Sequence, residues 1–205
     1  MEDDEIRGYI AQTLEVSVSS GYGTKEDVGD ALAEQVRDEF RERPEEEVEL
    51  EVRRWMDRLD VAWTAQRAAE ATWPDETTND RIDRAFEELT EHGVVALQDA
   101  GYTMSDGWSD VHEAASDVPR AWGGVFFHRQ DVERGVEGEG LMLAFGAFVD
   151  GAAHEAESLR LARLTRAVLE RHGVPTTWDG TLERRIAIDP FPWQRRRPRA
   201  PTDLQ

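Results

Sequence analysis

The sequence predicts an α+β protein in which helices come first and a small, mainly antiparallel sheet follows. In the first half, apolar residues recur at four-residue intervals, as they do on one face of a helix. From Val94 onward they stand in short runs between glycines and prolines, which is typical of buried strands. We therefore expect an acidic helical region over residues 1–93, an α+β domain over residues 94–193 with a long helix packed on one face of its sheet, and a basic flexible tail over residues 194–205.

Four helices are expected in the helical region. Thr24 and Asp27 have the spacing of a helix start signal, and Pro44 ends the helix that follows them. Gly93 is placed to close the fourth helix in a left-handed conformation. The inward faces of the four helices would carry Ile6, Ile10 and Leu14; then Val28, Leu32, Val36 and Phe40; then Val48, Val52, Trp55, Leu59 and Trp63; and finally Ile82, Phe86 and Leu89.

Strands and helices are mixed in the second region. Asp150 is expected to cap a long helix that ends near His172, and Asp179-Gly180 to form the tight turn of a hairpin. The other expected elements are strands near residues 94–97, 123–128 and 141–148, a short helix over residues 105–115, and a last strand with Ile186 and Ile188 on one face.

The charge balance argues against several classes of partner. The chain has 44 acidic and 24 basic residues, a net charge of −20, which is unfavourable for binding nucleic acid or an anionic membrane. The first residues are acidic, and no apolar run of about 18 residues is present. We therefore expect no signal peptide, no membrane span and a cytoplasmic location. The origin of the acidity stays open between genome composition, salt adaptation and function.

The chain contains no cysteine, which excludes disulfides and thiolate nucleophiles. No metal or other cofactor is expected either. A helical metal site typically has two histidines one turn apart, and neither His112 nor His154 has such a partner.

Residues 94–193 resemble an uncharacterised bacterial domain-of-unknown-function family of high-GC bacteria. The resemblance is carried by FHRQD at residues 127–131, GEGLMLAFG at 138–146, WDG at 178–180 and WQRRR at 193–197. Relatives carry a cysteine-rich stretch after the first strand, where this chain has residues 102–108 without cysteine. The resemblance implies a fold but no established activity.

The segment from His128 to Asp131 is the strongest local candidate for a site. It follows a predicted strand, and functional side chains are common where strands end. His128 could act as a general base oriented by Asp131, with Gln130 and Trp178 as further candidate residues. Alternatively, Asp131 caps a short helix that begins at Val132, and His128 only bonds the strand edge. The tryptophans of the second half either line one ligand cleft or fill the core.

The sequence favours a non-catalytic binding or protein-interaction module over an enzyme. Its partner would be another protein, bound through the acidic helical half. One alternative is a hydrolase or transferase that uses His128 and Asp131. A second alternative is an acidic nucleic-acid mimic that blocks a DNA-binding protein. The oligomeric state is not determined by any of these patterns.

Overall fold

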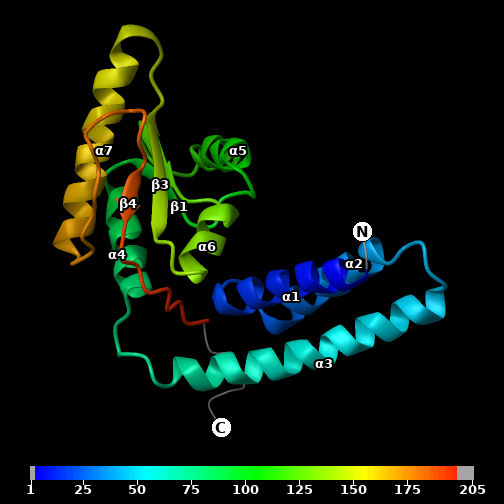
Figure 1. The fold of residues 1–205 in the computed structure, drawn as a ribbon. Coiled ribbons are helices and arrows are strands. Elements are labelled where there is room, and N and C mark those ends of the chain that lie inside the picture. Colours follow the sequence, from blue (N-terminus) through cyan, green and yellow to red (C-terminus); the bar gives the residue numbers. More distant parts are fainter. Residues whose placement is uncertain (1–2, 198–205) are drawn as a thin grey trace. The chain divides into compact units, whose positions relative to one another are not determined.

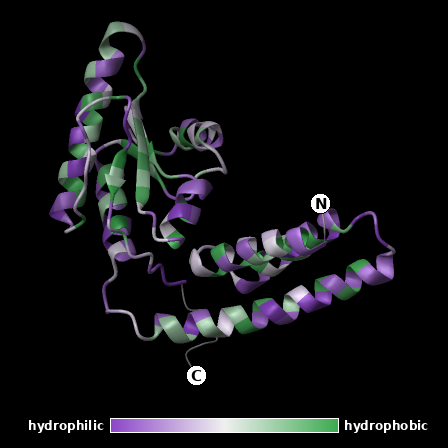
Figure 2. Ribbon diagram, viewed as in Figure 1, coloured by the Kyte–Doolittle hydropathy of each residue, from purple (hydrophilic) through white to green (hydrophobic). Residues whose placement is uncertain are grey.

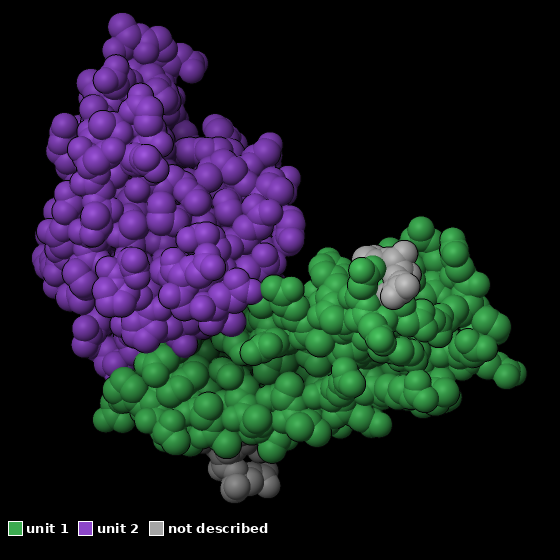
Figure 3. All heavy atoms as spheres, viewed as in Figure 1, with its two compact units in different colours: residues 1–75, 194–205 green, residues 76–193 purple. Residues whose placement is uncertain are grey.

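The structure is a computed structural model that describes residues 3–197 and falls into two compact units. The helical unit comprises residues 1–75 and 194–205, and the sheet unit comprises residues 76–193 (Figure 3). The boundary therefore follows Asp75 rather than residue 93. The reason is that the fourth helix packs on the first strand and on the last helix of the sheet unit.

Among the described residues, three helices build the helical unit (Figure 1). They are α1 (Asp3–Ser19), α2 (Lys25–Glu39) and α3 (Glu45–Glu70). The ion pair between Arg7 and Glu51, with a distance of 2.8 Å, joins the early part of α1 to the early part of α3. The ion pair between Lys25 and Asp60, also 2.8 Å, joins the start of α2 to a later turn of α3. Consequently α1 and α3 run in the same direction and α2 runs against both.

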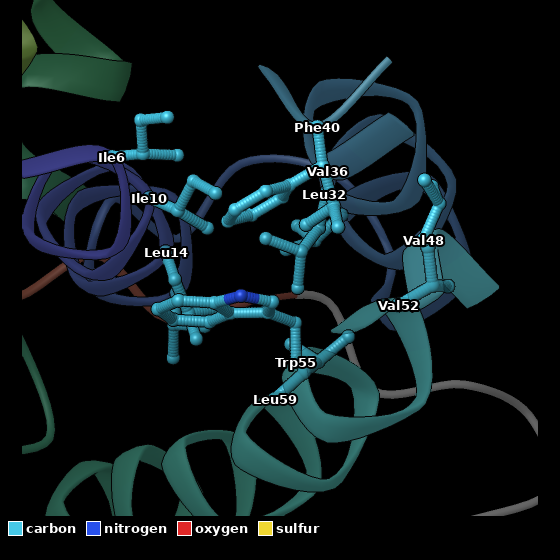
Figure 4. Packing of buried hydrophobic residues seen from close by; sticks show 12 residues of the cluster. Ile6, Ile10, Leu14, Leu32, Val36, Phe40, Val48, Val52, Trp55 and Leu59 are labelled. Carbon is cyan, nitrogen blue, oxygen red and sulfur yellow. The ribbon is translucent and has the colours of Figure 1, made fainter. Parts of the chain in front are cut away.

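The predicted helix faces form the core of this unit (Figure 4). Ile10 and Leu59 are fully buried, and Trp55, which reaches from α3 toward Leu14 of α1, is 2% exposed (Figure 4). Thr24 caps α2 as the sequence predicts, because its hydroxyl accepts the N–H of Asp27 while the Asp27 carboxylate accepts the N–H of Thr24. The N–H and the hydroxyl of Thr24 both donate to the Asp27 carboxylate, which lowers the pKa of Asp27.

Residues 194–197 are packed against the helical unit, which corrects the expected flexible tail for this part of it. Each of three consecutive arginines lies over an aromatic ring, Arg195 over Tyr22, Arg196 over Trp73 and Arg197 over Trp63. Arg197 also donates hydrogen bonds to the carbonyl oxygens of Ser17, Val18, Tyr22 and Gly23. The Arg197 guanidinium satisfies backbone acceptors left over at the end of α1, whereas Arg196 bonds the carbonyls of Pro74 and Asp75. The rest of the predicted tail, residues 198–205, lies outside the described residues.

The sheet unit has a four-stranded sheet in the order β1-β2-β3-β4. The β1–β2 pair is parallel, whereas the β2–β3 and β3–β4 pairs are antiparallel. The α+β prediction and the mainly antiparallel sheet are thus confirmed. The elements are α4 (Thr78–Glu91), β1 (Val94–Leu97), α5 (Met104–Ala114), β2 (Gly123–Phe126), α6 (Arg129–Val136), β3 (Leu141–Ala147), the short 3₁₀ helix η1 (Gly151–Ala153), α7 (His154–Arg171) and β4 (Ile186–Ile188).

Helices cover both faces of the sheet (Figure 1). The long helix α7 packs on β3 and, with α4, covers one face, while α5 and α6 lie on the other. Hydrophobic residues concentrate in the strands between these layers (Figure 2). Two adjacent glycines in β2 let the helices approach closely, because a Cβ on Gly123 would lie 2.2 Å from Leu161 and one on Gly124 would lie 2.4 Å from Val111.

Two local expectations for the sheet unit differ from the structure. Asp150 makes no side-chain cap, because the turn η1 separates it from the start of α7. The Asp179-Gly180 turn does not join two long strands, since on its near side only Thr177 pairs with β4, through an isolated bridge to Ala187. The main partner of β4 is β3, which pairs with all three of its residues.

Candidate functional site

The candidate residues His128 and Asp131 lie together at the start of α6. His128 is the N-cap residue, and α6 therefore begins at Arg129 rather than at Val132. Nδ1 of His128 accepts the backbone N–H of Asp131, and the Asp131 carboxylate accepts the backbone N–H of His128, each over 3.3 Å. This is a capping box in which histidine replaces the usual serine or threonine. Asp131 is completely buried and His128 is 5% exposed.

Arg185 completes this cluster from a distant part of the chain. Its guanidinium contacts both carboxylate oxygens of Asp131 at 2.9 Å. Burial lowers the pKa of His128; the negative charge of Asp131 opposes this shift, and the positive charge of Arg185 adds to it. The imidazole is therefore neutral at neutral pH. Because Nδ1 accepts a hydrogen bond, Nε2 carries the ring proton in this arrangement.

The geometry of the cluster has a direct chemical consequence. A general base needs an available lone pair within reach of the proton that it takes. The lone pair on Nδ1 of His128 points to the N–H of Asp131, and Asp131 is held by Arg185 and by the main chain. The arrangement holds the start of α6 in place, and it presents no free imidazole lone pair to a substrate.

The other two candidate residues lie apart from this pair. Gln130 is exposed on α6. Trp178 packs edge-on against Phe145, with ring centres 5.5 Å apart, and its indole N–H bonds the carbonyls of Thr181 and Arg184. Phe145 projects from the face of β3 opposite to that of its neighbour Ala144, which belongs to the core cluster under α5. Trp178 and α6 therefore lie on different faces of the sheet.

The remaining tryptophans of the sheet unit have separate environments. Trp108 packs edge-on against Phe126, and Trp193 packs against Phe127 and Phe191. The indole of Trp122 bonds the carbonyl of His92 and lies under Arg160. These contacts favour the core interpretation of the tryptophans over a shared ligand cleft. Among residues 3–197, no three histidine or carboxylate side chains converge on a possible metal position.

The prominent hollow of the helical unit is an apolar groove between α1 and α3. Its volume is about 740 Å³. All of its lining residues come from these two helices, so it lies on the side of the α1–α3 pair that α2 does not fill. We call it the α1–α3 groove; it is lined by Ala11, Leu14, Glu15, Val18, Ser19, Trp55, Asp57, Arg58, Val61, Ala62, Ala65, Gln66 and Ala69.

Apolar side chains in this groove are open to solvent. Val61 is 72% exposed, the largest exposure among the large hydrophobic residues described. Ala65 and Ala69 follow it at helical spacing and are also exposed. Exposed apolar surface of this kind is typical of interaction sites. In Figure 2 the C-terminal part of α3 carries pale green bands between purple and white ones.

Sequence reasoning missed this groove and the role of Arg185. The signal for the groove is a second apolar stripe in α3, Ala62, Ala65 and Ala69, which stands beside the stripe of tryptophans and leucine. Alanine is common both on solvent-exposed helix faces and in interfaces, so the stripe alone does not show which of the two this face is. Arg185 has no local signal at all, because its partner lies 54 residues away in the sequence.

The fold defines a two-unit α+β protein with a four-stranded mixed sheet in its sheet unit. The chain belongs to a family described as a domain of unknown function, DUF6891, whose sequence model matches residues 3–197. The match spans both units and includes the packed arginines 195–197. No curated protein and no solved structure matches the chain. No helix among residues 3–197 is long and apolar enough to cross a membrane.

Proposed function

We propose that this protein is a non-catalytic protein-interaction module that binds a segment of another protein in the α1–α3 groove. The observation that carries the proposal is the groove itself, an apolar hollow of about 740 Å³ with Val61 exposed inside it. Exposing this surface costs free energy in water, and a bound segment would recover it at about 25 cal/mol for each Å² covered.

The charge of the chain supports a protein partner in the cytoplasm. A net charge of −20 opposes nucleic acid and anionic lipid as ligands. The acidic nucleic-acid mimic has weaker support, because carboxylates of the helical unit alternate with arginines in ion pairs such as Arg37–Glu49 and Arg54–Glu51. The hydrolase or transferase has weaker support because His128 and Asp131 hold the start of α6.

Site-specific photo-crosslinking in the native cells tests this proposal. A photoreactive phenylalanine at Val61 lies in the groove, and one at Leu50 lies on the same helix outside the groove lining at 42% exposure. We expect a discrete protein adduct at Val61 that is absent at Leu50. The captured protein, once purified, should bind the intact chain, and Ala65→Glu should weaken that binding while Leu50→Glu leaves it unchanged.

Two results would contradict the proposal. One is equal crosslinking at both positions. The other is a captured protein whose affinity is the same for Ala65→Glu and the unmodified chain. Ala65 is exposed, so thermal unfolding of the variant should match that of the parent and show that the fold is intact.

A further inference from the structure

The shape of the α1–α3 groove suits a helix. The lining on α3 runs from Trp55 to Ala69, which at 1.5 Å per residue is about 20 Å, or four helical turns. Small residues line both walls, Ala11 on α1 and Ala62 and Ala65 on α3. Small side chains let another helix approach to the distance of about 8–10 Å found between packed helices. Since α2 fills the other side of the α1–α3 pair, a helix in the groove would become the fourth of a bundle.

Backbone hydrogen bonding also favours a helix over an extended segment. Both walls of the groove are helices whose internal N–H and C=O groups already bond within α1 and α3. An extended peptide would bury its own backbone groups there without partners, which costs free energy for each group. A helix brings its backbone groups already paired, and only its side chains need to match the groove.

The charged residues at the groove favour basic residues on both sides of the apolar face of a bound helix. Glu15 on α1 and Asp57 on α3 are exposed groove residues, and neither is within ion-pair distance of a basic side chain among residues 3–197. The guanidinium of Arg58 instead lies over the Trp55 ring, 4.5 Å from its centre. Residues 1–75 contain 21 acidic and 9 basic residues, a net of −12. A second copy would bring this same charge to the groove and be repelled, whereas a basic partner would be attracted.

We infer that the α1–α3 groove binds an amphipathic helix of a second protein, with arginine or lysine residues on both flanks of its apolar face. The inference rests on the proposed function and adds the conformation and charge of the bound segment. Leucine-sized side chains of the partner would cover Val61 and the alanines. Its basic flanks would lie next to Glu15 and Asp57.

Stapled helical peptides test the inference with the intact chain. The basic probe is a fluorescein-labelled helix of about 15 residues with leucines along one face and arginines on both flanks. The matched probes replace the arginines with glutamines or with glutamates. Fluorescence anisotropy at low and high salt reports affinity for the parent chain, for Ala65→Glu, for Leu50→Glu and for the double variant Glu15→Gln, Asp57→Asn.

We expect the basic probe to bind most tightly, the neutral probe less tightly and the acidic probe least tightly. Ala65→Glu should weaken the basic probe roughly tenfold, by placing a charge against its apolar face, and Leu50→Glu should not. The double variant should weaken the basic probe roughly fivefold without changing the neutral probe, and salt should reduce that difference.

Each other outcome overturns the inference in an identifiable way. Equal binding of all three probes, lost in Ala65→Glu, would retain the groove and reject the basic flanks. No binding of any probe, together with a partner crosslinked at Val61, would reject a helical ligand and leave the proposed function standing. A Val61 crosslink to a second copy of the chain would make the groove a dimer interface. Failure of both the probes and the crosslink would reject the proposed function as well.

Discussion

The guanidinium of Arg197 lies 4.3 Å from the centre of the Trp63 ring and donates to the carbonyls of Ser17 and Val18 at the end of α1. The side chain is 6% exposed. Burial lowers its pKa to about 10, so it is still charged at neutral pH. A cation at the C-terminal end of a helix stabilises the helix dipole and satisfies its unpaired carbonyls. A residue near the end of the chain thus completes the first helix.

Replacing this arginine should destabilise the helical unit. Arg197→Ala leaves buried carbonyls at the end of α1 without donors, so the free energy of unfolding should fall by about 2–4 kcal/mol. Urea unfolding followed by circular dichroism measures the change. Arg196→Ala is the control, because Arg196 is only half-buried and bonds the carbonyls of Pro74 and Asp75 in a loop. Equal losses in the two variants would show that the contacts of Arg197 to α1 are not the stabilising ones.

The Arg185–Asp131 pair should show strong coupling in a double-mutant cycle. Asp131 is completely buried, and removing either partner leaves a charge without its counter-ion. We expect Asp131→Ala to lower the free energy of unfolding by about 3–5 kcal/mol. The double variant Asp131→Ala, Arg185→Met should lose clearly less than the sum of the single variants. Additive losses would mean that the two side chains stabilise the sheet unit independently.

Stability should fall as the pH drops below the ordinary histidine pKa of about 6.5. Burial places the pKa of His128 below that value in the folded chain, so between the two values the unfolded chain binds the proton that the folded chain excludes. His128→Asn keeps an acceptor side chain at the N-cap but does not titrate. In thermal unfolding between pH 7 and 5 this variant should lose less stability than the parent. The control His154→Asn changes an exposed histidine and should follow the parent curve; parallel curves for all three proteins would refute the role of His128.

Close approach of α5 to the sheet should make Gly124 intolerant of alanine. The added Cβ would lie 2.4 Å from Cγ1 of Val111, which is fully buried. Gly124→Ala should therefore cost about 1–3 kcal/mol through overpacking. Gly8→Ala is the matched change in open space, with nothing within 4 Å of the new Cβ, and it should raise helix stability by about 0.5–1 kcal/mol. Chemical denaturation measures whether the two substitutions change stability in opposite directions. A Gly124→Ala variant as stable as the parent would show that α5 can shift away from the sheet.

Local signals in the sequence predict the helices well because they act between near neighbours. Thr24 and Asp27 are three residues apart and form the capping box that their spacing suggests. The stripe from Val48 to Leu59 is buried as its period predicts. The signal near Asp131 is more ambiguous. Its carboxylate does take part in a helix cap, but the helix begins earlier because His128 serves as the N-cap, a role that histidine seldom takes.

The sequence by itself determined the fold class, the helix faces and the acidic character of the chain, because periodicity, capping pairs and net charge are properties of neighbouring residues or of the whole composition. Only the tertiary structure decided where α4 belongs, which side chain neutralises Asp131, and that the arginines before residue 198 are packed. The contacts of Arg185 with Asp131 and of Arg197 with the end of α1 join residues from 54 to 180 positions apart. Their energy depends on geometry that exists only once the helices and strands have packed, as does the α1–α3 groove, which needs two helix faces brought side by side.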